Sequence, residues 1–181
     1  MHRLAGIAVA LLALLLHACA QLQTKSPVDQ VFELTGRLAA RQGQEAFSGN
    51  VSWRHAGSVD ELLVTSPIGQ GVARIVRTGD SVVLTTAEPR EYRAPDVESL
   101  TEQALGFRLP LKGLADWVRA RPSPDVPAKV ERGADGKIAS IEQSGWRIEY
   151  QEYAEGPQPL PTRLRLMYPG VDLRLAISDW K

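Results

Sequence analysis

Apolar and polar residues alternate along most of the chain after residue 30. The alternation is clearest in the stretches 32–41, 47–54, 146–151, 163–166 and 171–178. A spacing of two places successive side chains on opposite faces of a strand. Each stretch therefore predicts an antiparallel strand with one apolar face and one solvated face.

Turn signals such as Gly79-Asp80 and Pro169-Gly170 separate these stretches and bound further strands. Shorter strands are expected at 81–86, 91–94, 128–131 and 137–143. With a hairpin at 62–76, this makes about ten or eleven strands in sequence order. Such a series is typical of a meander that curls into a barrel, and we expect an unclosed antiparallel half-barrel in a mainly β fold.

Two helices interrupt the strands. Asp96 is a suitable N-cap for a helix over 97–105, and Gly106 ends it. A second helix is expected over 111–119. Both segments carry an apolar stripe, so we expect them to cover the apolar face of the curled sheet as a lid.

The hairpin at 62–76 has an unusual tip. Its first strand leads into Ser66-Pro67-Ile68-Gly69, where Pro in second place and Gly in fourth are typical of a type I turn. Hairpin tips usually carry Asn, Asp or Ser, whereas this one carries Ile68. Either Ile68 packs back onto the sheet, or it is one of the isolated apolar residues common on surfaces, or its exposure serves a function.

Residues 1–18 predict a signal peptide. Arg3 precedes the apolar run 4–16, which has the length of a signal core and is too short to span a membrane. The pair Ala18-Cys19 resembles the bacterial lipobox, although His17 departs from the small or apolar residue usual there. The resemblance implies cleavage before Cys19 and acylation of that residue; an ordinary secretory signal is the alternative. Because several acyl chains hold a protein stably, we expect a membrane anchor.

Residues 19–30 predict the lipidated cysteine and a flexible tether. The segment is polar, contains Pro27 and has no periodicity. The second residue after the cleavage site is Ala20, where many lipoproteins retained in the inner membrane carry Asp. By resemblance to that sorting rule, we expect the periplasmic face of the outer membrane. Residues 31–181 then form a single domain, long enough for a real core.

Charge and residue content exclude several classes of function. Without Arg3, twenty Lys and Arg stand against twenty-one Asp and Glu, which leaves no basic excess for nucleic acid. Cys19 is the single cysteine, so disulfides and cysteine clusters are excluded. The mature chain has one histidine, His55, and no carboxylates at ligand spacing, so we expect neither a metal nor a cofactor.

Catalytic motifs are also missing. A Ser-His-Asp site would need His55, which is expected to lie in a turn, and no Gly-x-Ser-x-Gly elbow is present. Asp60-Glu61 and the pair Glu152 and Glu155 are expected to be solvated surface. We therefore predict that the protein is not an enzyme. The alternative is a periplasmic lipid-modifying enzyme that depends on His55.

The large apolar residues lie mostly on the predicted inward faces and on the helix stripes. They either form an ordinary packed core or line an apolar cavity suited to acyl chains, since a half-barrel is too open to fill itself. The residues expected to line such a cavity are Phe32, Leu34, Leu38, Phe47, Val51, Trp53, Leu100, Leu114, Trp117, Trp146, Ile148, Leu164 and Leu175.

An ordered series of short motifs resembles the LolB family of bacterial outer-membrane lipoprotein receptors. The motifs include Phe47-Ser48-Gly49, the stretch 62–69, Tyr92-Arg93-Ala94-Pro95-Asp96, the stretch 105–111 and Gly145-Trp146-Arg147-Ile148. The series covers residues 32 to 180. Each motif alone is weak, but their order together with the lipobox is specific.

The resemblance implies a helix-lidded open barrel around a hydrophobic cavity. It implies a receptor that accepts lipoproteins from a periplasmic carrier of the LolA type, binds their acyl chains and inserts them into the outer membrane. Pro67, Ile68 and Gly69 match the family's membrane-delivery loop, so Ile68 is expected to be exposed. The expected partners are the carrier, the acylated cargo and outer-membrane lipid, with the protein itself a monomer. The alternative is a structural or assembly outer-membrane lipoprotein with a filled core and no acyl transfer.

Overall fold

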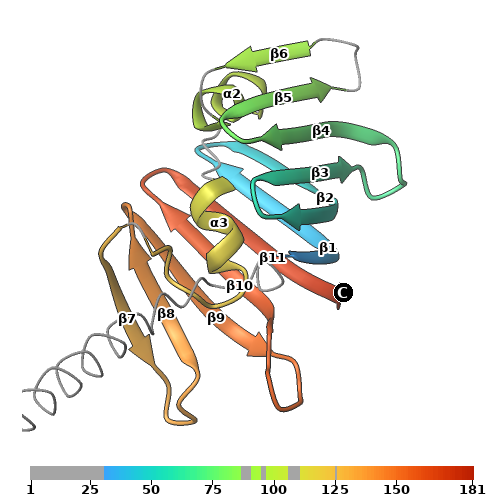
Figure 1. The fold of residues 1–181 in the computed structure, drawn as a ribbon. Helices are drawn as coiled ribbons and strands as arrows, with labels where there is room; N and C mark the ends of the chain where they lie inside the picture. Colours follow the sequence, from blue (N-terminus) through green and yellow to red (C-terminus); the bar gives the residue numbers. More distant parts are fainter. Residues whose placement is uncertain (1–30, 87–90, 95–96, 106–110, 125) are drawn as a thin grey trace, which may run out of the picture.

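The computed structural model describes residues 31–86, 91–94, 97–105, 111–124 and 126–181. The predicted signal peptide, Cys19 and the tether lie outside the described residues, as do Asp96 and Gly106 at the ends of the first predicted helix. Within the described ranges, an eleven-stranded sheet carries two short helices on one face (Figure 1). Neither helix is long and apolar enough to cross a membrane.

The elements follow the predicted order closely. The strands are β1 (Val31–Gln42), β2 (Glu45–Ala56), β3 (Val59–Thr65), β4 (Gly71–Thr78), β5 (Ser81–Thr86), β6 (Glu91–Ala94), β7 (Ala128–Arg132), β8 (Ile138–Gln143), β9 (Trp146–Tyr153), β10 (Pro161–Tyr168) and β11 (Val171–Trp180). The helices are α2 (Val97–Leu105) and α3 (Leu111–Trp117). The second helix ends two residues before the predicted Arg119, where a turn leads to Ala120 in the left-handed region with a φ of 54°.

The sheet is continuous but does not close. Its strand order is β6-β5-β4-β3-β2-β1-β11-β10-β9-β8-β7, and all pairings are antiparallel. The first and last strands meet in the middle, where Leu38 pairs with Leu175. The strands that come before and after the two helices in the sequence, β6 and β7, form the two edges of the sheet. The predicted unclosed antiparallel sheet with two inserted helices is confirmed.

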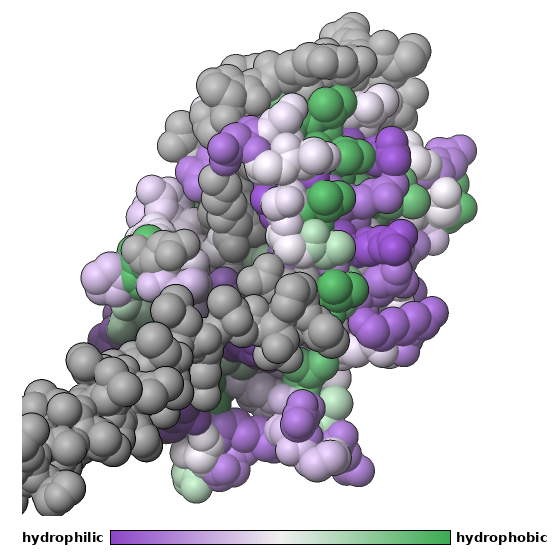
Figure 2. Space-filling model, in the orientation of Figure 1, coloured by the Kyte–Doolittle hydropathy of each residue, from purple (hydrophilic) through white to green (hydrophobic). Residues whose placement is uncertain are grey.

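The apolar face of the sheet forms one core. A row of paired residues crosses five neighbouring strands, each at most 4% exposed: Leu34, Trp53, Leu62, Ile75 and Leu84. The helices add Leu100, Leu114 and Trp117 to the same cluster. Figure 2 shows a column of apolar residues that runs downward right of the centre of the view, with hydrophilic residues along its right side.

Candidate functional site

The loop between β3 and β4 forms the tight turn that its sequence predicts. Gly69 N donates to Ser66 O at 2.9 Å, and Ser66 N donates to Gln70 O at 2.7 Å. The side chain of Ile68 is 81% exposed. Ile68 therefore does not pack back onto the sheet, and the loop presents a large apolar side chain to its surroundings.

Contacts with β2 hold this loop in place. Asn50 Nδ2 donates to Ser66 O at 3.3 Å. At Gly49, an added Cβ would lie 2.2 Å from Thr65 O, so only glycine allows the two backbones to approach this closely. The loop projects from the end of the β3–β4 hairpin (Figure 1). A stable sheet thus holds the exposed side chain of Ile68.

The thirteen residues predicted to line a cavity come together between the sheet and the helices, which themselves supply Leu100, Leu114 and Trp117. Eleven of them belong to the buried core cluster, and the other two, Leu38 and Phe47, pack against it. Ile148 and Leu164 are both 0% exposed. The side chains of the sheet and of the described parts of the two helices thus cover the apolar face.

Gln143 on β8 attaches the end of α3 to the sheet. Its Oε1 accepts from Trp117 Nε1 at 2.7 Å and from Ser123 N at 2.9 Å. Its Nε2 donates to Ser123 O at 2.8 Å and to Val126 O at 2.6 Å. Tyr150 supports the same end of the helix by donating to Trp117 O at 2.7 Å, and burial raises the pKa of its phenol, which therefore stays protonated. Sequence reasoning missed Gln143, because a glutamine in a strand carries no signal of burial.

We expect Gln143→Leu to lower the free energy of unfolding by about 2–3 kcal/mol. The variant removes the partner of the buried Trp117 Nε1 and of three backbone groups, Ser123 N, Ser123 O and Val126 O, and an unsatisfied buried group costs about 1–3 kcal/mol. Urea unfolding followed by tryptophan fluorescence measures the change. Gln151→Leu on the exposed side of β9 is the matched control, and equal losses in both variants would contradict the assigned role.

A second buried polar cluster joins three strands at the other end of the core. Asp60 Oδ1 accepts from Trp53 Nε1 at 2.8 Å and from His55 Nδ1 at 2.6 Å, while Oδ2 accepts from Arg77 Nε at 2.6 Å. Burial alone would raise the pKa of Asp60. The hydrogen bonds from His55 and Trp53, with the positive charge of Arg77, outweigh burial and lower that pKa below its ordinary value.

This cluster corrects two predictions from the sequence. Asp60 is fully buried and not solvated surface, whereas its neighbour Glu61 is exposed and pairs with Arg74. His55 lies inside β2 and not in a turn, with its ring stacked on Phe32 at 5.0 Å between centroids. Alternation places both residues on the inward face, and their partners on adjacent strands make burial tolerable.

The hydrogen bonds of this cluster connect neighbouring strands to one another, so its role is structural. Every polar contact described for Asp60 comes from the side chains of neighbouring strands, and both His55 and Asp60 are closed off from solvent. Glu152 and Glu155 are exposed, as expected. Across the ranges that the structure describes, no three His, Cys, Asp or Glu side chains gather in a way that could hold a metal.

Comparisons with known proteins give one family. The profile of the family "Outer membrane lipoprotein LolB" matches residues 30–180. The chain is 42% identical to the outer-membrane lipoprotein LolB of Thiobacillus denitrificans, over 100% of this chain and 98% of that protein. It is also 42% identical to the outer-membrane lipoprotein LolB of Nitrosomonas europaea, over 84% of this chain and 74% of that protein.

Solved structures share the fold at low identity. A LolA superfamily protein from Nitrosomonas europaea aligns with a TM-score of 0.53 at 11% identity, covering 84% of this chain and 86% of the other. A putative outer membrane lipoprotein-sorting protein domain from Vibrio parahaemolyticus aligns with a TM-score of 0.54 at 10% identity, covering 84% and 85%. At such identities the likeness concerns the fold alone.

Proposed function

Given that the chain belongs to the LolB family of outer membrane lipoproteins, we propose that it takes acylated lipoproteins from a periplasmic carrier of the LolA type and inserts them into the outer membrane. The observation that carries the proposal is the 81% exposure of Ile68 on a loop fixed to the sheet. The protein works at the outer membrane. Its anchor is Cys19 after removal of residues 1–18, residues 19–30 form the tether, and residues 31–181 form a single, monomeric receptor domain.

Acyl chains bind on the lidded face of the sheet. Leu114, Trp117 and Val118 cover this face, and an acyl chain takes their place against the strands when the lid moves. Gln143 and Tyr150 hold the C-terminal end of α3, so the lid pivots about that end. Apolar contacts are exchanged for other apolar contacts, which keeps the cost of opening low.

The direction of transfer follows from differences in fit. Each buried methylene contributes about 0.8 kcal/mol, and both the carrier and the receptor offer that burial. A cargo therefore moves only if the receptor offers a better fit or a less strained lid. Release into a bilayer is downhill again, because the whole acyl chain is then surrounded by hydrocarbon.

A transfer assay tests this function. Residues 20–181 contain all eleven strands and the core, so this form keeps the fold without the acylated cysteine. It is mixed with a carrier preloaded with a lipoprotein, and pull-down shows which protein holds the cargo. We expect the cargo to migrate to the receptor; cargo that stays on a functional carrier would refute the proposal.

The burial of these side chains in one cluster beneath the lid favours one rival, a structural lipoprotein with a permanently filled core. A fluorescent fatty acid separates the two functions. Saturable binding with increased probe fluorescence is expected for the receptor. A protein that binds no acyl probe while remaining folded would instead be a structural component.

A further inference from the structure

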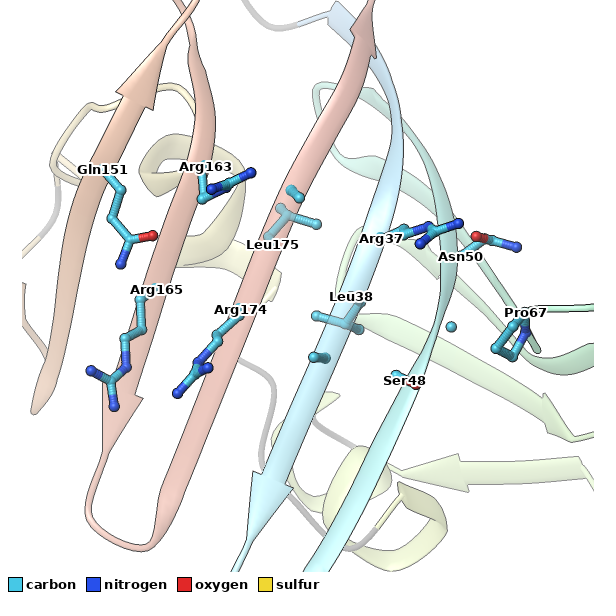
Figure 3. Close-up of a pocket in the computed structure, with 13 residues that line it drawn as sticks. Arg37, Leu38, Ser48, Asn50, Pro67, Gln151, Arg163, Arg165, Arg174 and Leu175 are labelled. Carbon is cyan, nitrogen blue, oxygen red and sulfur yellow. The ribbon is translucent and has the colours of Figure 1, made fainter.

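A hollow of about 620 Å³ opens beside Arg37, Arg163 and Arg174, on the side of the strands away from the helix drawn behind them in Figure 3. It crosses β9, β10, β11, β1 and β2 and reaches Pro67 in the β3–β4 loop. Four arginines from three strands line it: Arg37, Arg163, Arg165 and Arg174 (Figure 3). We call this hollow the arginine groove.

Strand register explains the shape of the groove. Ala176 pairs with Arg37 on one side and with Arg163 on the other. Neighbouring strands lie about 4.8 Å apart, so these two arginines start about 10 Å apart across a floor of small residues. Figure 3 shows Arg37 on one side of β11 and Arg163 and Arg165 on the other. A phosphate group has room between them.

Positive charge is in excess in the groove. Arg163 pairs with Glu152 at 3.0 Å, and Arg165 and Arg174 share Asp172 at 2.7 and 3.4 Å. For Arg37, the described part of the chain supplies no acidic partner. Four arginines thus stand against three carboxylates, Glu152, Asp172 and Glu149. Of these, Glu149 lies opposite Arg165 on β9 and is already paired with Arg147 at 3.1 Å, so positive charge remains in excess.

The close spacing of the arginines lowers the stability of the folded sheet. Arg165 pairs directly with Arg174 across β10 and β11, and like charges in directly opposed positions destabilise a sheet. Asp172 offsets part of that repulsion. An anion in the groove would offset the rest, since guanidinium groups bind phosphate through paired hydrogen bonds.

The groove adjoins the delivery loop. Pro67 lines the groove, and the next residue is the exposed Ile68. Entry of Ile68 into a bilayer would bring Pro67, and with it the adjoining end of the groove, toward the lipid phosphates. We propose that the arginine groove binds the phosphate groups of anionic phospholipids in the target membrane. This inference rests on one part of the proposed function, namely that the protein acts at a membrane.

Vesicle co-sedimentation of residues 20–181 tests this site without carrier or cargo. One set of vesicles contains phosphatidylcholine alone, and the other also contains phosphatidylglycerol. The variant R37Q/R174Q is compared with K129Q/R132Q, which removes the same charge from exposed positions on β7 at the edge of the sheet. We expect R37Q/R174Q to bind the anionic vesicles about 25-fold more weakly, about fivefold for each charge, whereas K129Q/R132Q keeps its binding. On phosphatidylcholine alone, both should bind like the unaltered protein.

Several results would overturn the proposal. Equal binding of both double variants to anionic vesicles would show that only net charge matters. Equal weakening of R37Q/R174Q on both vesicle types would show that the groove does not recognise the anionic lipid. If R37Q/R174Q lost affinity for a purified acidic carrier but not for vesicles, the groove would belong to a protein partner. Because carrier and cargo are absent from the vesicle assay, a failure of cargo transfer leaves its result unchanged, and the two proposals fail separately.

Discussion

Replacing Ile68 with Glu is expected to stop delivery to the membrane while leaving uptake from the carrier intact. Ile68 is 81% exposed in the loop between β3 and β4 and is not part of the buried core cluster beneath the helices. Entry of an isoleucine side chain into an apolar environment contributes about 1.5–3 kcal/mol, and a carboxylate loses that gain and adds a desolvation cost. The rate of insertion should therefore fall at least ~10-fold.

Two measurements on one reaction separate the steps. Pull-down after mixing with a loaded carrier reports uptake, and flotation of the cargo with liposomes reports delivery. Ile68→Leu is the matched control, because it keeps an apolar side chain of similar size in the same turn. If the Glu and Leu variants delivered cargo equally, Ile68 would have no part in insertion.

Asp60→Asn is expected to cost about 3–5 kcal/mol of stability. The change leaves the buried guanidinium of Arg77 without its counter-charge, and a buried charge deprived of its partner has a cost of this size. Urea unfolding should show a lower midpoint. Glu61→Gln is the matched control one residue away, because Glu61 and its partner Arg74 are exposed and such pairs contribute little. A loss no greater than that of the control would show that the network does not stabilise the fold.

The carboxylate of Asp60 should also make the stability of the protein sensitive to acid. Its pKa in the folded state lies below the ordinary value of 3.8. The ionised carboxylate therefore contributes its stability above pH 3.8 and loses it as the pH falls below that value through the folded-state pKa. In Asp60→Asn this part of the acid dependence should be missing, which unfolding curves from neutral pH down through pH 3.8 would show.

The sequence by itself determined the local elements and the tip of the loop. Strand alternation is a repeat of two and depends on neighbouring residues alone, so the strands were predicted nearly to their ends. The helix Val97–Leu105 has the predicted bounds. The turn at Ser66-Pro67-Ile68-Gly69 follows from the φ preferences of Pro and Gly, and the ordered motifs were enough to indicate the family that the comparisons confirm.

Only the tertiary structure decided which distant residues meet. Alternation gives the face on which Asp60 and Gln143 lie but not their burial, because a polar residue tolerates burial only when distant parts of the fold supply its partners. The arginine groove joins Arg37 from the start of the domain with Arg174 from its end, through the pairing of β1 with β11. Alternation sets the face on which a side chain lies, but strand order and register set its neighbours across the sheet. Those depend on long-range pairing, which no local pattern in the sequence encodes.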